Sequence, residues 1–113
     1  HPIAELAQPD RWTAEHALEL DLNGERAVDH LVIEEDLRHG QRIRAYQVEA
    51  QTTSGWKPVA SGSTVGRRRI EKFAPVRTAK LRFRVTQADA IPQVQRLTAY
   101  SVTNAPPASA NGK

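Results

Sequence analysis

Hydrophobic and polar residues alternate along most of the chain, which is the pattern of strands with one buried face. The period of two is clearest at 80–85, where Leu81, Phe83 and Val85 point one way and three basic residues point the other. Residues 17–22 repeat it with three leucines. Further strands are predicted at 28–33, 43–50, 56–59, 65–73 and 97–102. Short strands at this spacing indicate an all-β fold, an antiparallel β-sandwich.

Turn residues separate the predicted strands. Asn23-Gly24 is predicted to be a turn because both residues tolerate a positive φ, and 52–55 is predicted to be a hairpin turn. Pro58 has no N–H to donate, so its strand is expected at a sheet edge or is broken there. Residues 3–8 have the sequence of one helical turn. The core is expected to contain Leu18, Leu20, Leu22, Leu31, Ile33, Tyr46, Val48, Ile70, Phe73, Leu81, Phe83, Val85 and Leu97.

The length of 113 residues predicts one domain. We expect an N-terminal remnant at 1–9, the sandwich at 10–102 and a disordered tail at 103–113, where the sequence is small, unpatterned and contains proline. The chain begins His-Pro-Ile without an initiator Met, so we expect it to be an excised part of a longer protein. No apolar run reaches the length of about 18 residues that a membrane helix needs.

Composition argues against several classes of chemistry. The chain has no Cys, which excludes disulfides and thiolate sites, and its four histidines lack the spacing of zinc ligands. A phosphate-binding glycine loop is absent as well. Glu34 and Asp36 would face the same side of a strand, as the two carboxylates of a glycosidase do. A solvated strand end beside Arg38 and Arg42 is the commoner explanation of this pair.

The basic residues raise nucleic acid as a minor alternative. The runs Arg67-Arg68-Arg69 and Lys80, Arg82, Arg84 offer contacts for phosphates. Against this, 16 basic and 13 acidic residues give a net charge of only +3, and acidic residues are spread through the same sequence. Cations that alternate along an exposed sheet face also keep a sheet soluble.

Two tryptophans are candidate platforms for a sugar ring. Trp56 follows a turn at the start of a strand, and we expect it to be half-buried. Trp12 stands in the segment before the first long strand and is the more plausible exposed platform.

Four segments in order carry a resemblance to a known family. Residues 31–46 contain a hydrophobic strand, an acidic pair and then Gly40-Gln41-Arg42, and 56–66 begin Trp-Lys and end in Gly-Ser-Thr-Val-Gly. Together with 76–85 and 92–100, they resemble the C-terminal discoidin-like domain of bacterial α-L-fucosidases of glycoside hydrolase family 29. Where that family usually has Tyr-Lys-Arg, this chain has Arg67-Arg68-Arg69.

The resemblance implies a jelly-roll sandwich of the galactose-binding-domain-like class behind a (β/α)8 barrel. The barrel of such enzymes carries the catalytic residues, and no residue set in this chain is suited to the hydrolysis. The implied location is periplasmic or secreted. No cofactor is expected. The calcium site often seen in discoidin-like folds uses the region before Trp12, where only eleven residues stand here.

Two roles stay open at this point. The first is an accessory domain that packs on the catalytic barrel, with carbohydrate contact as an additional role. The second is an autonomous carbohydrate-binding module for galactose- or fucose-type glycans, with a site formed by Trp12, Glu35, His39, Gln41, Arg42 and Arg68. In addition, Glu35 and Arg42 are predicted to form a buried ion pair that holds the loop around Gly40.

Overall fold

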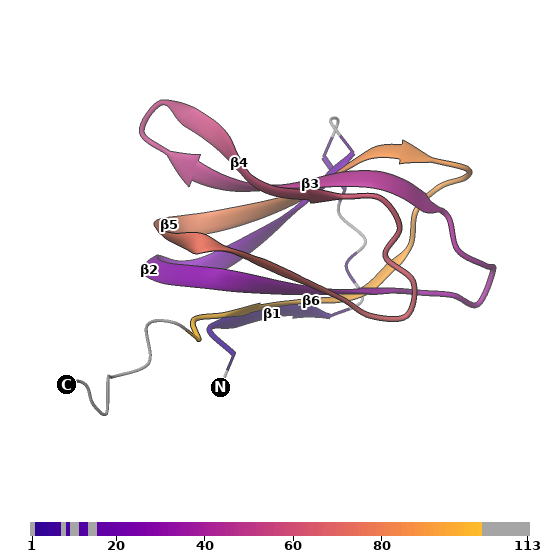
Figure 1. The fold of residues 1–113 in the computed structure, drawn as a ribbon, viewed down its shortest axis with the longest axis horizontal. Helices are drawn as coiled ribbons and strands as arrows, with labels where there is room; N and C mark the ends of the chain where they lie inside the picture. The colour runs from indigo at the N-terminus through magenta and orange to yellow at the C-terminus, as the bar shows by residue number, and fades with distance from the viewer. Residues whose placement is uncertain (1, 8, 10–11, 14–15, 103–113) are drawn as a thin grey trace.

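The computed structural model describes residues 2–7, 9, 12–13 and 16–102, and these form an all-β fold (Figure 1). The predicted tail at 103–113 lies outside the described residues. The strands are β1 (Ala4–Ala7), β2 (Ala17–Glu35), β3 (Ile43–Thr52), β4 (Gly55–Gly62), β5 (Arg69–Ala88) and β6 (Val94–Tyr100). All neighbouring strands are antiparallel, in the order β1-β6-β2-β5-β3-β4. No helix that could span a membrane is found in this part of the chain.

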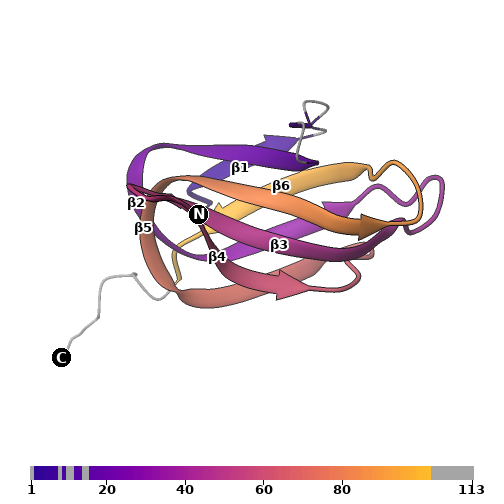
Figure 2. The same ribbon diagram turned by 90° about the horizontal axis from the view of Figure 1, so that it is seen from above.

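The sheet forms two layers because its two longest strands bend. The first half of β2 and the second half of β5 pair with each other in one layer, which β3 and β4 extend. The second half of β2 pairs with the first half of β5 and with β6, and β1 completes this other layer. Figures 1 and 2 show β3 and β4 on one side of the molecule and β1 and β6 on the other. The predicted β-sandwich is confirmed.

The bend in β2 occurs at the predicted turn, which is part of a continuous strand. Asn23 and Gly24 have φ angles of 59° and 106°, and the pairing with β5 shifts register between Asp21 and Arg26. The Asn23 N–H donates to the Asp21 carboxylate over 2.8 Å. Positive φ angles and an irregular register bend a strand locally. The two residues therefore carry β2 from one layer to the other, and they do not reverse the chain into a separate strand.

Two other expectations about the elements are corrected. Residues 4–7 form β1, where a helical turn was predicted for 3–8, because their backbone pairs with β6 and every second side chain is partly buried. The strands predicted at 65–73 and 80–85 are one long strand, β5. The expectation for Pro58 is confirmed, since β4 is an edge strand and its pairing with β3 shifts register at this proline.

The predicted core residues are buried between the two layers, with one exception. Ile70 is 54% exposed. It lies three residues from buried Phe73, and residues an odd number apart point to opposite faces of a regular strand. Buried Glu71 takes the inward position, where its carboxylate accepts a hydrogen bond from the Tyr46 hydroxyl. Burial and the negative charge of Glu71 raise the pKa of Tyr46 well above its ordinary value.

We predict that Gly62→Ala destabilises the sandwich. Gly62 pairs with Tyr46, and a Cβ at this position would collide with the Tyr46 ring and lie 2.9 Å from the Glu71 Oε2. Overpacking of this kind costs about 1 to 3 kcal/mol. Thermal and urea unfolding measure the loss, with exposed Ser61→Ala on the same strand as the control. Equal stability of the two variants would contradict the close packing.

Candidate functional site

One buried carboxylate organises an end of the sandwich. Glu35 is the last residue of β2 and points inward, on the same face as Leu31 and Ile33, with 2% of its surface exposed. Its Oε2 accepts hydrogen bonds from the backbone N–H groups of Arg42 at 2.7 Å and Ile43 at 3.1 Å. Its Oε1 accepts one from Gly66 at 3.3 Å. A carboxylate bound by three N–H donors is satisfied without a cationic partner.

The predicted ion pair between the side chains of Glu35 and Arg42 is therefore wrong, although the two residues are hydrogen-bonded. Arg42 reaches Glu35 with its backbone N–H, while its guanidinium donates from Nη1 to the Ile91 carbonyl over 2.8 Å. The physical reason is that the backbone donors already occupy the carboxylate, and the charged head of a partly exposed arginine stays near water.

Three connections meet above Glu35, namely 36–42 between β2 and β3, 63–68 between β4 and β5, and 89–93 between β5 and β6. Backbone hydrogen bonds join them: Glu35 donates to the Gly66 carbonyl at 3.2 Å, Asp36 to that of Gln93 at 2.9 Å, and Asp89 to that of Arg42 at 2.9 Å. We call this region the loop end. β1 begins and β6 ends toward the opposite end of the sandwich (Figure 1).

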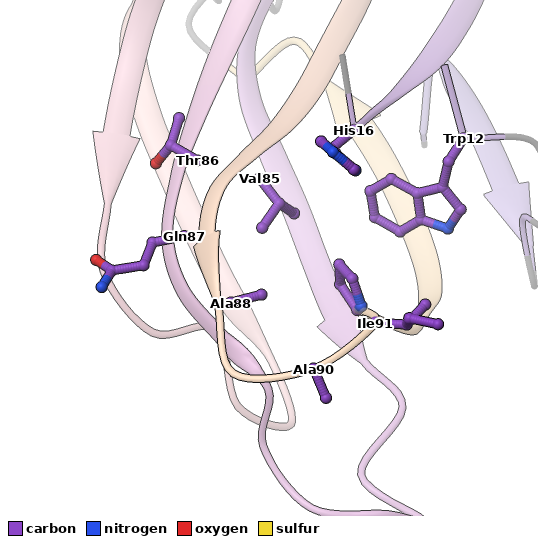
Figure 3. A pocket seen from close by; sticks show the side chains of 9 residues that line it. Trp12, His16, Val85, Thr86, Gln87, Ala88, Ala90 and Ile91 are labelled. Atoms are coloured by element: carbon purple, nitrogen blue, oxygen red, sulfur yellow. The ribbon is translucent and has the colours of Figure 1, made fainter. Parts of the chain in front are cut away.

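A hollow of about 500 Å³ opens at the loop end (Figure 3). Trp12 and His16 lie on one flank of it, and Ile91 lies below them in this view. Ile91 is 77% exposed, more than any other large hydrophobic side chain among the described residues. The lining is mostly apolar and consists of Trp12, His16, Val85, Thr86, Gln87, Ala88, Ala90, Ile91 and Pro92.

The flank is held by a tight turn before β2. The His16 N–H donates to the Thr13 carbonyl at 3.0 Å, and the Thr13 hydroxyl accepts from the Ala17 N–H at 3.2 Å. His16 itself has a φ of 59°, a backbone conformation that few side chains adopt. Its carbonyl accepts from the Val85 N–H at 3.1 Å, which ties the turn to β5. These bonds hold the backbone at Thr13 and His16, and the Trp12 side chain is partly buried against the core.

A second hollow, of about 390 Å³, shares Trp12, Ile91 and Pro92 with the first. Its polar rim is the ion pair between Asp36 and Arg38, with Nη2–Oδ2 at 2.6 Å and Nε–Oδ1 at 3.0 Å. Hydrogen bonds from Arg38 hold the pKa of the Asp36 carboxyl below its usual value. Trp12 therefore stands between an apolar hollow and a charged one.

The structure brings the residues of the predicted carbohydrate site to the loop end, in different settings. Trp12 lines both hollows, and Arg42 touches Ile91 through its guanidinium. Glu35 lies beneath the surface, bound by the backbone. His39, Gln41 and Arg68 are exposed on the connections and do not line the hollows.

Sequence reasoning missed His16, Ile91 and Pro92. Ile91 could have been noticed in the sequence, because it precedes a proline in a segment without alternation of hydrophobic and polar residues. An apolar side chain in such a segment is not placed in the core by a strand. Trp56, the other tryptophan, is partly buried as expected. It lies on the outer face of its layer, with the Arg82 guanidinium 4.4 Å above its ring.

No group of three or more histidine or acidic side chains in the described part of the chain is arranged to hold a metal ion.

The fold matches parts of known structures. A crystal structure from Bacteroides thetaiotaomicron that is named as an α-L-fucosidase matches with a TM-score of 0.79 and 38% identity. The match covers 90% of this chain and 22% of that one. A Ruminococcus gnavus GH29 fucosidase, solved with fucose, matches with a TM-score of 0.69 and 26% identity, over 78% of this chain and 18% of that one. The chain is similar to a domain-sized part of α-L-fucosidases. It spans about a fifth of their length.

A chitosan-binding module from a Paenibacillus chitosanase/glucanase has the same fold. It matches with a TM-score of 0.62 at 14% identity, over 75% of this chain and 67% of the module. No family model and no curated protein matches the chain. The first two likenesses fit a small domain of a fucosidase-like protein, and the third shows a shared fold.

We predict that Glu35→Gln loosens the loop end. The amide keeps one acceptor oxygen but turns an NH2 group toward backbone donors, so at least one charge-assisted hydrogen bond is lost, at a cost of about 1 to 3 kcal/mol. Neighbouring Glu34→Gln, on the more exposed face, should change the free energy of unfolding by less than about 0.5 kcal/mol.

Arg42→Met completes the test, because it removes the guanidinium and keeps the N–H bond to Glu35. It should cost less than about 1 kcal/mol. Denaturant unfolding of the three variants distinguishes the cases: a loss for Arg42→Met as large as that for Glu35→Gln would mean that the side chains pair after all.

Proposed function

We propose that this chain is a non-catalytic accessory domain of an α-L-fucosidase and that its loop end binds carbohydrate. The observation that carries the proposal is the partly buried Trp12 ring, which borders an apolar hollow and a second hollow that contains the Asp36–Arg38 pair. A sugar ring has apolar C–H faces and polar hydroxyl groups at its edge. A site that binds it therefore combines an apolar surface with polar side chains nearby.

A role in hydrolysis is not supported by the carboxylates at this end. Asp36 is engaged by Arg38, and Glu35 is buried beneath backbone donors. Glycoside hydrolysis needs two carboxyl groups that flank a substrate bond and differ in protonation. The proposal therefore assigns hydrolysis to a catalytic barrel elsewhere in the parent enzyme.

The resemblance to α-L-fucosidases supplies the finer parts of the proposal. It suggests that the domain is of the discoidin-like type, packs against a (β/α)8 barrel and works in the periplasm or outside the cell. It also suggests fucose- or galactose-containing glycans as the ligands. An autonomous carbohydrate-binding module would use the same hollow, and it differs only in acting without the barrel.

We predict that Trp12→Ala abolishes binding and that Trp56→Ala does not. Titration of the chain with fucose, galactose and their oligosaccharides should give dissociation constants of about 1 mM, in the range of a single weak site. Loss of a central aromatic contact should weaken binding about tenfold or more. Trp56 is the matched control, because it lies on an outer sheet face under Arg82 and away from the hollows.

Each outcome has a definite meaning. Binding that survives in Trp12→Ala, or that is lost equally in both variants, would refute a site at this ring. If the wild-type chain binds none of the sugars, the result would favour an accessory domain that only packs on the catalytic barrel. Circular dichroism of both variants verifies that the sandwich persists.

A further inference from the structure

Arginines without acidic partners stand at the loop end. Arg67 and Arg68 are exposed and follow Gly66, and Arg42 bonds only to a carbonyl. Within the described residues, none of the three guanidinium groups forms an ion pair within 4.0 Å of a carboxylate oxygen. Unpaired guanidinium groups are the side chains best suited to bind a carboxylate or a sulfate with two parallel hydrogen bonds.

The acidic residues of this end are already bound elsewhere. Asp36 pairs with Arg38 at 2.6 Å, and Asp89 pairs with Arg44 at 2.5 Å. Glu35 is covered by backbone N–H groups. Glu34 is the one exception among the described acidic residues of this end: it lies opposite Arg96 of β6 and makes no ion pair with a described residue. The charge that remains at the loop end is therefore positive.

The two connections that carry these arginines are held together before any ligand arrives. The Gly66 N–H and the Arg42 N–H bind the two oxygens of the same Glu35 carboxylate, at 3.3 Å and 2.7 Å. Gly66 has a φ of 71°, a conformation that suits glycine, and the two arginines that follow it are exposed. A pre-organised loop binds its ligand at a smaller entropic cost.

We propose that the loop end binds an anionic glycan, one that carries sulfate or carboxylate groups, through Arg42, Arg67 and Arg68. The proposal rests on the proposed function, since the Trp12 hollow is taken as the site of another sugar ring of the same glycan. The guanidinium groups hold the acidic substituent. The neutral ring lies against Trp12 and Ile91.

A nucleic acid fits these observations less well. The other basic stripe of the chain is neutralised within the protein, because Arg82 and Arg84 bind Glu49 at 2.6 and 3.4 Å, and Lys80 lies 3.9 Å from Glu19. Binding of single strands needs a continuous basic groove with several stacking rings. The loop end has one tryptophan and three unpaired arginines among its described residues.

The test compares matched acidic and neutral ligands by calorimetric titration of the whole chain. The ligands are a sulfated fucan oligosaccharide, the same oligosaccharide after desulfation, a galacturonic acid oligosaccharide and a single-stranded DNA oligonucleotide. We expect at least one acidic glycan to bind about tenfold more tightly than the desulfated one, with an advantage that falls as salt is added. The sulfated and uronic ligands distinguish the two anions.

The variant Arg67→Gln/Arg68→Gln should remove this preference and leave binding of the desulfated oligosaccharide unchanged. Its control is Arg26→Gln/Arg77→Gln, which removes the same charge at the far bend of β2 and β5, where both side chains are exposed. The control should keep the preference.

Four results would overturn the inference. If acidic and neutral oligosaccharides bind equally, the anionic site is wrong and the proposed function stands. If none of the glycans binds, the proposed function fails with it. A preference lost equally in the control would mean a response to net charge alone. Binding of the DNA as tight as that of the best glycan would mark the loop end as a nucleic-acid surface.

Discussion

The loop end depends on a single charge buried in a β-sandwich. Glu35 occupies a position that the strand pattern reserves for a hydrophobic side chain, and its carboxylate is compensated by N–H groups from two separate connections. A buried carboxylate that lacked these donors would be strongly unfavourable, so the connections must keep the conformation that supplies them. The geometry of the surface above, where the arginines stand, follows from this requirement.

The strand pattern was sufficient to predict most of the fold. Leucines at 18, 20 and 22 and the alternation at 81–85 identify the core faces correctly, because burial on one face leaves a period of two in the sequence. The pattern could not show that Asn23 and Gly24 bend a strand and do not end it. A positive φ is compatible with both outcomes, and the choice is made by pairing with β5, which is a long-range interaction.

The candidate site was only partly predictable for a related reason. Trp12 was identified from its residue type and its place outside the strands. Ile91 and His16 become neighbours of Trp12 only when β5 and the turn before β2 are brought together by the bond from Val85 to His16. Glu35 was correctly expected to be buried, but its partners are backbone groups, and any residue except proline at position 42 would supply the same N–H.

The bends in β2 and β5 couple the two layers of the sandwich. Each strand contributes its first half to one layer and its second half to the other, so the hydrogen-bond ladders of both layers share the same two strands. A segment opens locally when it makes few contacts with the rest of the protein. Because β2 and β5 belong to both layers, neither layer can open without the other. Amide protons in the middle of both layers should then exchange with solvent at similar rates, through one global unfolding event. Because the pairings join residues far apart in the chain, the domain is also expected to refold slowly for its size.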